Sequence, residues 1–143
     1  MKIILASDHA GFTIKEHIKA FLLKQEIEVL DYGTFSYDSV DYPDFSHAAA
    51  LQVTEDIGSI GILICGSGNG ICMTANKHIG IRAALCWNEE IAMMARAHND
   101  AYILCMPGRY VTVLEAEAIT TTFLNTKFES GRHLLRINKI ENE

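Results

Sequence analysis

The strongest constraint on the fold is the alternation of short strand-like runs with longer stretches of helical periodicity. The short runs predict strands at 2–6, 28–31, 61–65, 81–86 and 102–106. The longer stretches predict helices at 12–25, 45–55, 71–77, 88–97 and 112–124, with a last helix at about 129–139. Strands joined by helical crossovers predict an α/β fold: a single doubly wound, Rossmann-like domain over residues 1–143, with a five-stranded parallel sheet flanked by helices.

Length and composition agree with one folded domain. The chain has 143 residues, of which 49% are hydrophobic and 21% charged, enough for one core and too few for two ordinary domains. No repeat, low-complexity tract or linker interrupts it. The formal net charge of −6 argues against a nucleic-acid partner, because binding a phosphate backbone requires a concentrated cationic surface.

The sequence also argues against a membrane protein. Its longest apolar run, at 60–65, is too short to cross a bilayer, and the first residues predict a strand rather than a signal peptide. The cysteines lack the spacing of zinc ligands or of a CxxC motif; they are Cys65, Cys72, Cys86 and Cys105. We therefore expect reduced thiols, no bound metal and a cytoplasmic location.

A glycine-rich turn follows the third predicted strand, in the segment Cys65-Gly66-Ser67-Gly68-Asn69-Gly70. Glycines let the backbone approach a ligand closely, and free N–H groups at the start of a helix favour an anion. The spacing lacks the GK[ST] of a P-loop and the third glycine of a dinucleotide-binding fingerprint. An anion-binding turn and a purely structural turn are both compatible with this segment.

Cys65 ends the strand directly before this turn. Buried cysteines are common and mostly inert, which gives one interpretation of this residue. N–H groups at a helix start lower the pKa of a thiol, which gives the other interpretation, a reactive thiolate. Cys72, Cys86 and Cys105 lack this setting, so we expect them to fill the core.

Further polar residues follow the first two strands. In a parallel sheet, ligands bind beyond the carboxyl ends of the strands, where the strand order reverses. Asp8 and His9 are therefore expected at the same crevice as the glycine turn; the alternative interpretation of Asp8 is that it only caps the next helix. After the second strand, Tyr42 is a candidate for contacting a substrate hydroxyl, and Asp44 is expected to cap a helix.

His98 ends the fourth helix just before the fifth strand, which places it at the opposite, amino edge of the sheet. It either interacts with the helix dipole or joins the crevice across a subunit interface, so we expect a dimer with composite sites. Arg109 follows the fifth strand, and Arg132 and Arg136 share one face of the last helix. These arginines form either a solvated basic surface or, with His9, a clamp for a phosphate dianion.

Together these segments resemble the ribose-5-phosphate isomerase type B family, within a wider group that includes galactose-6-phosphate isomerase subunits. They run in family order: SDHAG at 7–11, DYP at 41–43, CGSGNG at 65–70, ANK at 75–77, GIRA at 80–83, HND at 98–100 and GRH at 131–133. The resemblance implies no metal or organic cofactor and a small-molecule sugar phosphate as substrate. It also implies a homodimer with active sites shared between subunits, with a tetramer as the alternative assembly.

The resemblance also implies a role for each candidate residue. Cys65 would be the base that moves a proton between C2 and C1, and Ser67 would help to stabilise the enediolate. His98, with Asp8 nearby, would open the furanose ring. The remaining substrate contacts would come from His9, Tyr42, Gly66, Gly68, Asn69, Gly70, Asn99, Arg109, Arg132 and Arg136. One branch of the family has a glutamate after the glycine turn; Ile71 in that position places this chain in the cysteine branch.

The expected activity is the interconversion of ribose 5-phosphate and ribulose 5-phosphate in the pentose phosphate pathway. Two alternatives stay open at this stage. A six-carbon sugar phosphate, such as galactose 6-phosphate or allose 6-phosphate, would use the same chemistry and residues. A non-catalytic sugar-phosphate-binding module would use the glycine turn but would have no need of Cys65 or His98.

Overall fold

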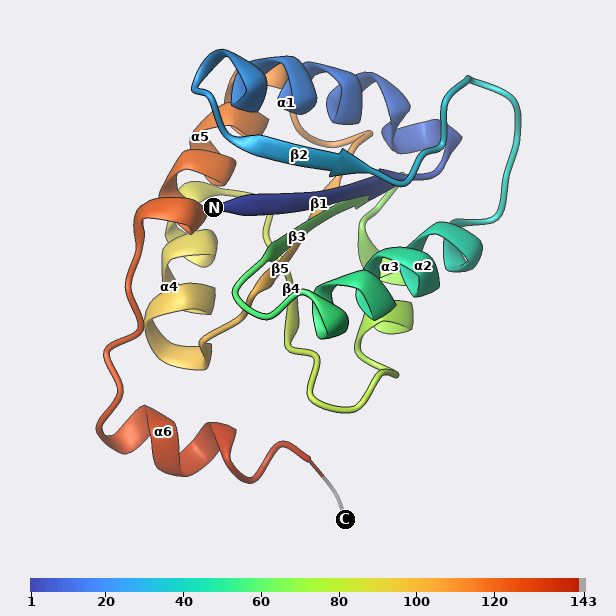
Figure 1. The fold of residues 1–143 in the computed structure, drawn as a ribbon. Helices are drawn as coiled ribbons and strands as arrows, with labels where there is room; N and C mark the ends of the chain where they lie inside the picture. The colour runs from blue at the N-terminus through green and yellow to red at the C-terminus, as the bar shows by residue number, and fades with distance from the viewer. Residues whose placement is uncertain (142–143) are drawn as a thin grey trace.

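The computed structural model describes residues 1–141 and confirms the predicted α/β class (Figure 1). Its strands are β1 (Lys2–Ser7), β2 (Glu28–Asp31), β3 (Ile60–Cys65), β4 (Ala83–Leu85) and β5 (Ile103–Pro107). They form one five-stranded sheet in the order β2-β1-β3-β5-β4, and every neighbouring pair is parallel. This is the doubly wound sheet that the alternating pattern predicts.

The helical elements are η1 (His9–Gly11), α1 (Phe12–Lys24), α2 (Tyr42–Glu55), α3 (Asn69–Ala75), α4 (Glu89–Asn99), α5 (Val113–Asn125) and α6 (Arg132–Ile137). The expectation that Asp44 caps a helix is wrong. α2 begins earlier, because Pro43 is well suited to a first helical turn, and Asp44 lies inside that turn. α6 is also shorter than predicted, because Ser130 and Gly131 have positive φ angles, which a helix does not accommodate.

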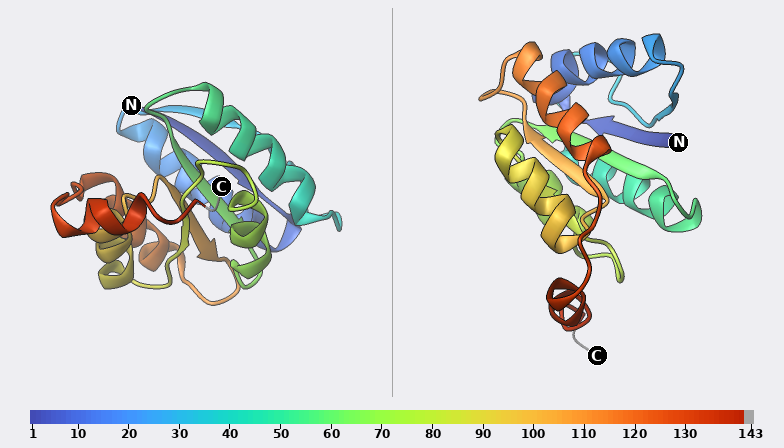
Figure 2. Two further views of the ribbon diagram at one scale, coloured as in Figure 1. Left: turned by 90° about the horizontal axis from the view of Figure 1, so that it is seen from below. Right: turned by 90° about the vertical axis from the view of Figure 1, so that its left-hand side faces the viewer.

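The helices cover both faces of the sheet, and each face has its own hydrophobic core (Figures 1 and 2). α1, α4 and α5 pack on one face, through residues such as Ile18, Ala95 and Phe123. α2 and α3 pack on the other, through residues such as Ala50 and Ile71. None of the helices within residues 1–141 is both long and apolar enough to cross a membrane.

The order of the strands determines where a ligand can bind. β2 lies on one side of β1, and the chain then crosses to place β3 on the other side, so the strand order reverses between β1 and β3. Ser7 at the end of β1 pairs with Ile64, one residue before the end of β3. The loops that follow these two strands therefore flank the switch point of the sheet, where ligands bind in folds of this type.

Candidate active site

The backbone conformation of the turn after β3 requires glycine. Gly68 has a φ of +78°, and a Cβ there would lie 2.4 Å from Leu85 Cδ1 and 3.0 Å from the carbonyl carbon of Met106. The loop after β5 anchors the turn, because the N–H groups of Gly108 and Arg109 donate to the carbonyls of Cys65 (2.8 Å) and Gly66 (3.0 Å). The turn is therefore held by backbone hydrogen bonds to the loop after β5 and by close packing against β4 and β5.

Cys65 ends β3 with only 3% of its surface exposed. Burial raises the pKa of its thiol, whereas the N–H groups of Ile71, Gly68 and Ser67 lower it and Asp8 raises it further, for a net rise. The expected N–H groups thus surround the sulfur, but the expectation of a lowered pKa is wrong for this chain. The physical reason is that desolvation of a thiolate outweighs its stabilisation by the three donors.

An open hollow of about 490 Å³ lies beside the turn. Its walls come from the glycine turn, β4, β5 and the loops after them, and they comprise Ser67, Asn69, Leu85, Trp87, Pro107 and Tyr110. The Ser67 hydroxyl accepts hydrogen bonds from the backbone N–H (3.3 Å) and the side-chain amide (3.1 Å) of Asn69. The hollow therefore offers a hydroxyl and an amide beside the turn that carries Cys65.

The loop after β1 brings two more candidates to this edge. Asp8 caps η1, because its carboxylate accepts a hydrogen bond of 3.0 Å from the N–H of Gly11; the predicted cap is thus present, and it does not exclude a further role for Asp8. His9 accepts a hydrogen bond of 3.1 Å at Nδ1 from the N–H of Val40. Since Nδ1 is an acceptor, the ring proton is on Nε2, which can donate to an anion.

Tyr42 and Arg109 cover the glycine turn from two sides. The Tyr42 ring lies so close to Gly70 that a Cβ there would be 2.3 Å from Cζ of the tyrosine. The Arg109 guanidinium lies against Gly66, where a Cβ would be 3.0 Å from Nη1. The phenol of Tyr42 and the guanidinium of Arg109 therefore lie next to the glycine turn, at the carboxyl edge of the sheet where the sequence predicts them.

The other candidates lie at the opposite edge. His98, at the end of α4, stacks on His133 of α6, with ring centroids 4.2 Å apart and planes inclined by 11°. α6, which carries Arg132 and Arg136, lies beside the end of α4 at the amino edge (Figure 1). Within one chain, these two arginines do not join Arg109 and His9, so the four residues do not form a single clamp in the isolated chain.

Asn99 is also at the amino edge, in a hollow separate from the glycine turn. This hollow has a volume of about 420 Å³, and Arg82, Ile140 and Glu141 contribute to its walls. Asn99 therefore belongs with His98 and the two arginines of α6. The expectation that the fourth helix ends far from the glycine turn of its own chain is confirmed.

Two residues of this amino-edge group were not assigned a role from the sequence. The Glu129 carboxylate lies 3.5 Å from Nε2 of His98 and 3.7 Å from Nε2 of His133. Glu129 and His133 are four residues apart, a spacing that would bring their side chains together on a helix. Glu129, however, precedes the start of α6. Their contact with His98 depends on the packing of α6 against α4, which the sequence does not reveal.

His98, Glu129 and His133 are the group within residues 1–141 whose ligand atoms are close enough to hold a metal ion, all within 4.8 Å of one another. A metal bound by histidine lies in the plane of the imidazole ring. The two rings are stacked, and one ion cannot lie in both of two parallel planes. The observed arrangement therefore suits a shared proton or counterion better than a metal.

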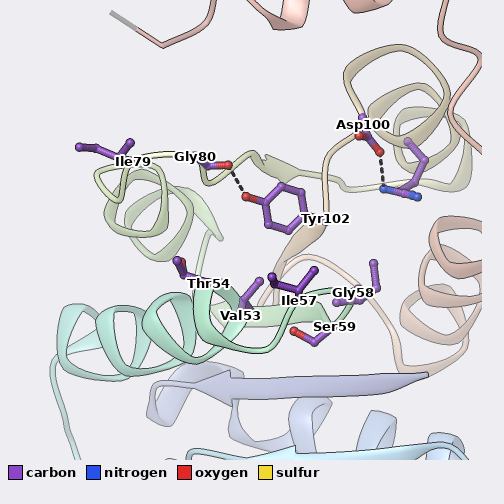
Figure 3. A pocket seen from close by; sticks show the side chains of 11 residues that line it. Val53, Thr54, Ile57, Gly58, Ser59, Ile79, Gly80, Asp100 and Tyr102 are labelled. Atoms are coloured by element: carbon purple, nitrogen blue, oxygen red, sulfur yellow. Dashed lines mark hydrogen bonds and ion pairs between the residues drawn. The ribbon is translucent and has the colours of Figure 1, made fainter. Parts of the chain in front are cut away.

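A further hollow, of about 410 Å³, opens at the amino edge between α2, the start of β3 and the end of α4 (Figure 3). The Tyr102 hydroxyl there donates to the carbonyl of Gly80, and Arg96 donates to the carboxylate of Asp100 (3.2 Å). None of the candidate residues predicted from the sequence lines this hollow. Without Cys65 or any other predicted catalytic group, it is not the candidate active site.

The fold is that of a doubly wound α/β protein with polar side chains at its switch point, and comparison with known proteins shows the family to which the chain belongs. The family model described as ribose/galactose isomerase matches residues 3–140, and the chain belongs to this family. A ribose-5-phosphate isomerase B from Escherichia coli is 40% identical over 139 residues, which cover 97% of this chain and 93% of the relative. A probable ribose-5-phosphate isomerase B from Mycoplasma pneumoniae is 42% identical over 139 residues, covering 96% and 91%.

Solved structures show the same fold. A ribose 5-phosphate isomerase from Thermotoga maritima has a TM-score of 0.95 at 48% identity, over 97% of this chain and 96% of its own. The ribose-5-phosphate isomerase B of Mycoplasma genitalium, with bound ribulose-5-phosphate, has a TM-score of 0.94 at 44% identity, over 97% and 93%. The family resemblance inferred from the ordered motifs is thus confirmed.

Proposed function

We propose that this chain is an aldose–ketose isomerase that interconverts ribose 5-phosphate and ribulose 5-phosphate. The observation that carries this proposal is the position of Cys65, at the switch point of the sheet and surrounded by the N–H groups of the glycine turn. The names of the relatives support the substrate, as does the ribulose-5-phosphate bound to the Mycoplasma genitalium protein. The four free cysteines agree with a cytoplasmic enzyme of the pentose phosphate pathway.

The active site is composite and requires a homodimer. The groups around Cys65 and around His98 lie at opposite ends of the strands. β3 has six residues, so the two ends are roughly 20 Å apart, farther than side chains reach. A second subunit that places its His98 and Asn99 at the glycine turn completes the site, and a tetramer can then form from two such dimers.

The reaction begins with ring opening, because the C2 hydrogen is acidic only in the open-chain aldehyde. His98 of the second subunit transfers protons at the ring oxygen and the anomeric hydroxyl, with Asp8 near the reacting end. Cys65, once deprotonated, removes the C2 proton and returns it to C1. The N–H groups of the glycine turn, with Ser67, stabilise the cis-enediolate; losing one such donor typically costs roughly 10²–10³ in kcat.

The phosphate group, which lies away from the reacting carbons, is the part of the substrate that the protein grips most strongly. His9 and Arg109 of one subunit and Arg132 and Arg136 of the other form the clamp, in which arginine suits the phosphate through paired N–H donors. Tyr42 and Asn99 contact the sugar hydroxyls. Binding energy from the phosphate orients C1 and C2 without acting on them directly.

Replacing the sulfur tests this function directly. We expect Cys65→Ser to fold normally but to lose ribose 5-phosphate turnover by at least roughly 10²-fold, because general acid–base catalysis contributes that much. Solvent deuterium should enter C1 of ribulose 5-phosphate with the wild type and not with the variant, as measured by NMR. Cys72→Ser, which changes another buried thiol, is the control.

Near-normal turnover by Cys65→Ser would remove Cys65 from its role. Binding of the sugar phosphate without exchange or turnover in the wild type would favour a non-catalytic module instead. The family description covers both ribose and galactose. Comparing kcat/KM for ribose 5-phosphate with that for galactose 6-phosphate and allose 6-phosphate distinguishes the five-carbon from the six-carbon substrate.

A further inference from the structure

Glu129 connects the end of α4 to α6 through two separate sets of contacts. Its backbone N–H donates a hydrogen bond of 3.0 Å to the carbonyl of Ala97, one residue before His98. Its carboxylate lies between the Nε2 atoms of His98 and His133, at 3.5 and 3.7 Å. The backbone hydrogen bond alone ties the segment before α6 to the end of α4, so the contacts of the carboxylate are independent of it.

The Glu129 carboxylate lies where positive charge on the stacked imidazole rings would cause repulsion. Two protonated rings with centroids 4.2 Å apart repel each other, and Arg132 adds a further positive charge next to His133. Partial burial lowers the pKa of His133, and the charges of His98, Arg132 and Arg136 lower it further, whereas Glu129 raises it. The pKa of His133 is nevertheless lowered overall, so the carboxylate within ion-pair distance of both rings offsets only part of this repulsion.

The same contact orients His98. Its side chain is 37% exposed, and within residues 1–141 the Glu129 carboxylate is the acidic group that it contacts. At 3.5 Å this contact is an ion pair rather than a hydrogen bond, so the carboxylate acts through its charge: it favours the ring rotation and the tautomer that place a proton on Nε2, which leaves Nδ1 to act on a ligand. Stacking on His133 restrains the plane of the ring.

We infer that Glu129 is a positioning residue: its carboxylate holds the stacked His98 and His133 in the orientation that ring opening requires. This inference rests on the proposed function, in which His98 opens the furanose ring. Glu129 itself touches neither C1 nor C2 and acts through His98. It also couples the ring-opening histidine to α6, which carries Arg132 and Arg136.

Ribulose 5-phosphate permits a test that separates ring opening from proton transfer. Its phosphorylated O5 cannot close a furanose ring, so deuterium exchange at C1 requires only Cys65 and the enediolate cradle. Glu129→Gln keeps the size of the side chain and the backbone contact but removes the charge. We expect its kcat for ribose 5-phosphate to fall roughly ten- to a hundredfold, with C1 exchange and the KM for ribose 5-phosphate within about twofold of the wild type.

Two further variants complete the test. Glu90→Gln removes a carboxylate from the exposed start of α4, far along the helix from His98, and should behave as the wild type. The double variant Glu129→Gln/His98→Gln should be no slower than His98→Gln alone, because Glu129 acts through that ring. Equal losses in turnover and exchange, a loss expressed as a raised KM, or no loss at all would overturn the inference. A wild type that neither isomerises nor exchanges would instead refute the proposed function.

Discussion

Cys65 is subject to two opposing effects on its pKa. Burial at the end of β3 raises the pKa of the thiol, and the N–H groups of Ile71, Gly68 and Ser67 counteract this only in part. The isolated chain therefore holds Cys65 as a neutral thiol at neutral pH. In the proposed dimer we expect the arginines of the second subunit to bring positive charge to this edge, which favours the thiolate.

Cys86 shows the same desolvation without any catalytic setting. Burial, with a smaller contribution from Cys72, raises its pKa from an ordinary 9.0 to about 12. The folded protein retains this proton longer than the unfolded chain does, so the stabilisation is complete below pH 9.0 and is lost as the pH rises toward 12. This group alone should lower the free energy of unfolding by roughly 2 kcal/mol between pH 8 and pH 10.5.

Urea unfolding at several pH values checks this expectation. Cys86→Ala should be less stable at pH 7, because it leaves a cavity, but its stability should fall less steeply above pH 9. An identical alkaline slope in the wild type and in Cys86→Ala would show that the Cys86 thiol does not titrate as its burial requires.

At the scale of elements, the glycine turn combines a left-handed backbone with close packing. Gly68 and Gly80 have similar φ angles, +78° and +83°, but a Cβ would meet Leu85 at Gly68 and open space at Gly80. Gly80→Ala should therefore cost only the backbone strain of roughly 1–2 kcal/mol. Gly68→Ala should cost roughly 1–3 kcal/mol more, because overpacking adds to the strain.

Chemical unfolding of the two variants measures this difference directly. Gly68→Ala should also lose turnover, because the turn carries the enediolate donors, whereas Gly80→Ala should retain it. Equal stability losses in the two variants would mean that the turn is not held by its contacts with β4 and β5.

The elements also show what a sequence can and cannot predict. The predicted strands agree with the observed ones to within about two residues, and the apolar runs of β1, β3 and β5 are almost fully buried. The apolar periodicity does not reveal the start of α2, because its first turn, with Pro43, lies before the periodic residues. The start of α6 was missed because the positive φ of Ser130, a residue other than glycine, is imposed by its surroundings.

At the scale of the whole molecule, one rule predicts on which edge of the sheet each group of candidate residues lies. Side chains that follow parallel strands meet at the carboxyl edge, and side chains that precede them meet at the amino edge. That rule placed Cys65 and Asp8 together and set His98 apart. It did not predict that Glu129 contacts His98, because that contact depends on how α6 packs against α4. Nor did it predict the raised pKa of Cys65, which depends on burial.

In the proposed dimer, the catalytic site forms only when the Cys65 edge of one subunit meets the His98 edge of another. Mixed dimers of two inactive variants test this claim directly. Cys65→Ser and His98→Gln would be refolded together in equal amounts, with the wild type and each variant refolded alone as controls. Half of the randomly formed dimers would be mixed, and each mixed dimer would contain one site with both native residues.

The measurement is ribose 5-phosphate turnover by the co-refolded mixture. Shared sites predict recovery to about a quarter of the refolded wild-type activity, since half of the dimers each regain one of two sites. A mixture that remains as inactive as the separate variants would contradict the account, because it would place Cys65 and His98 of the same chain in one site.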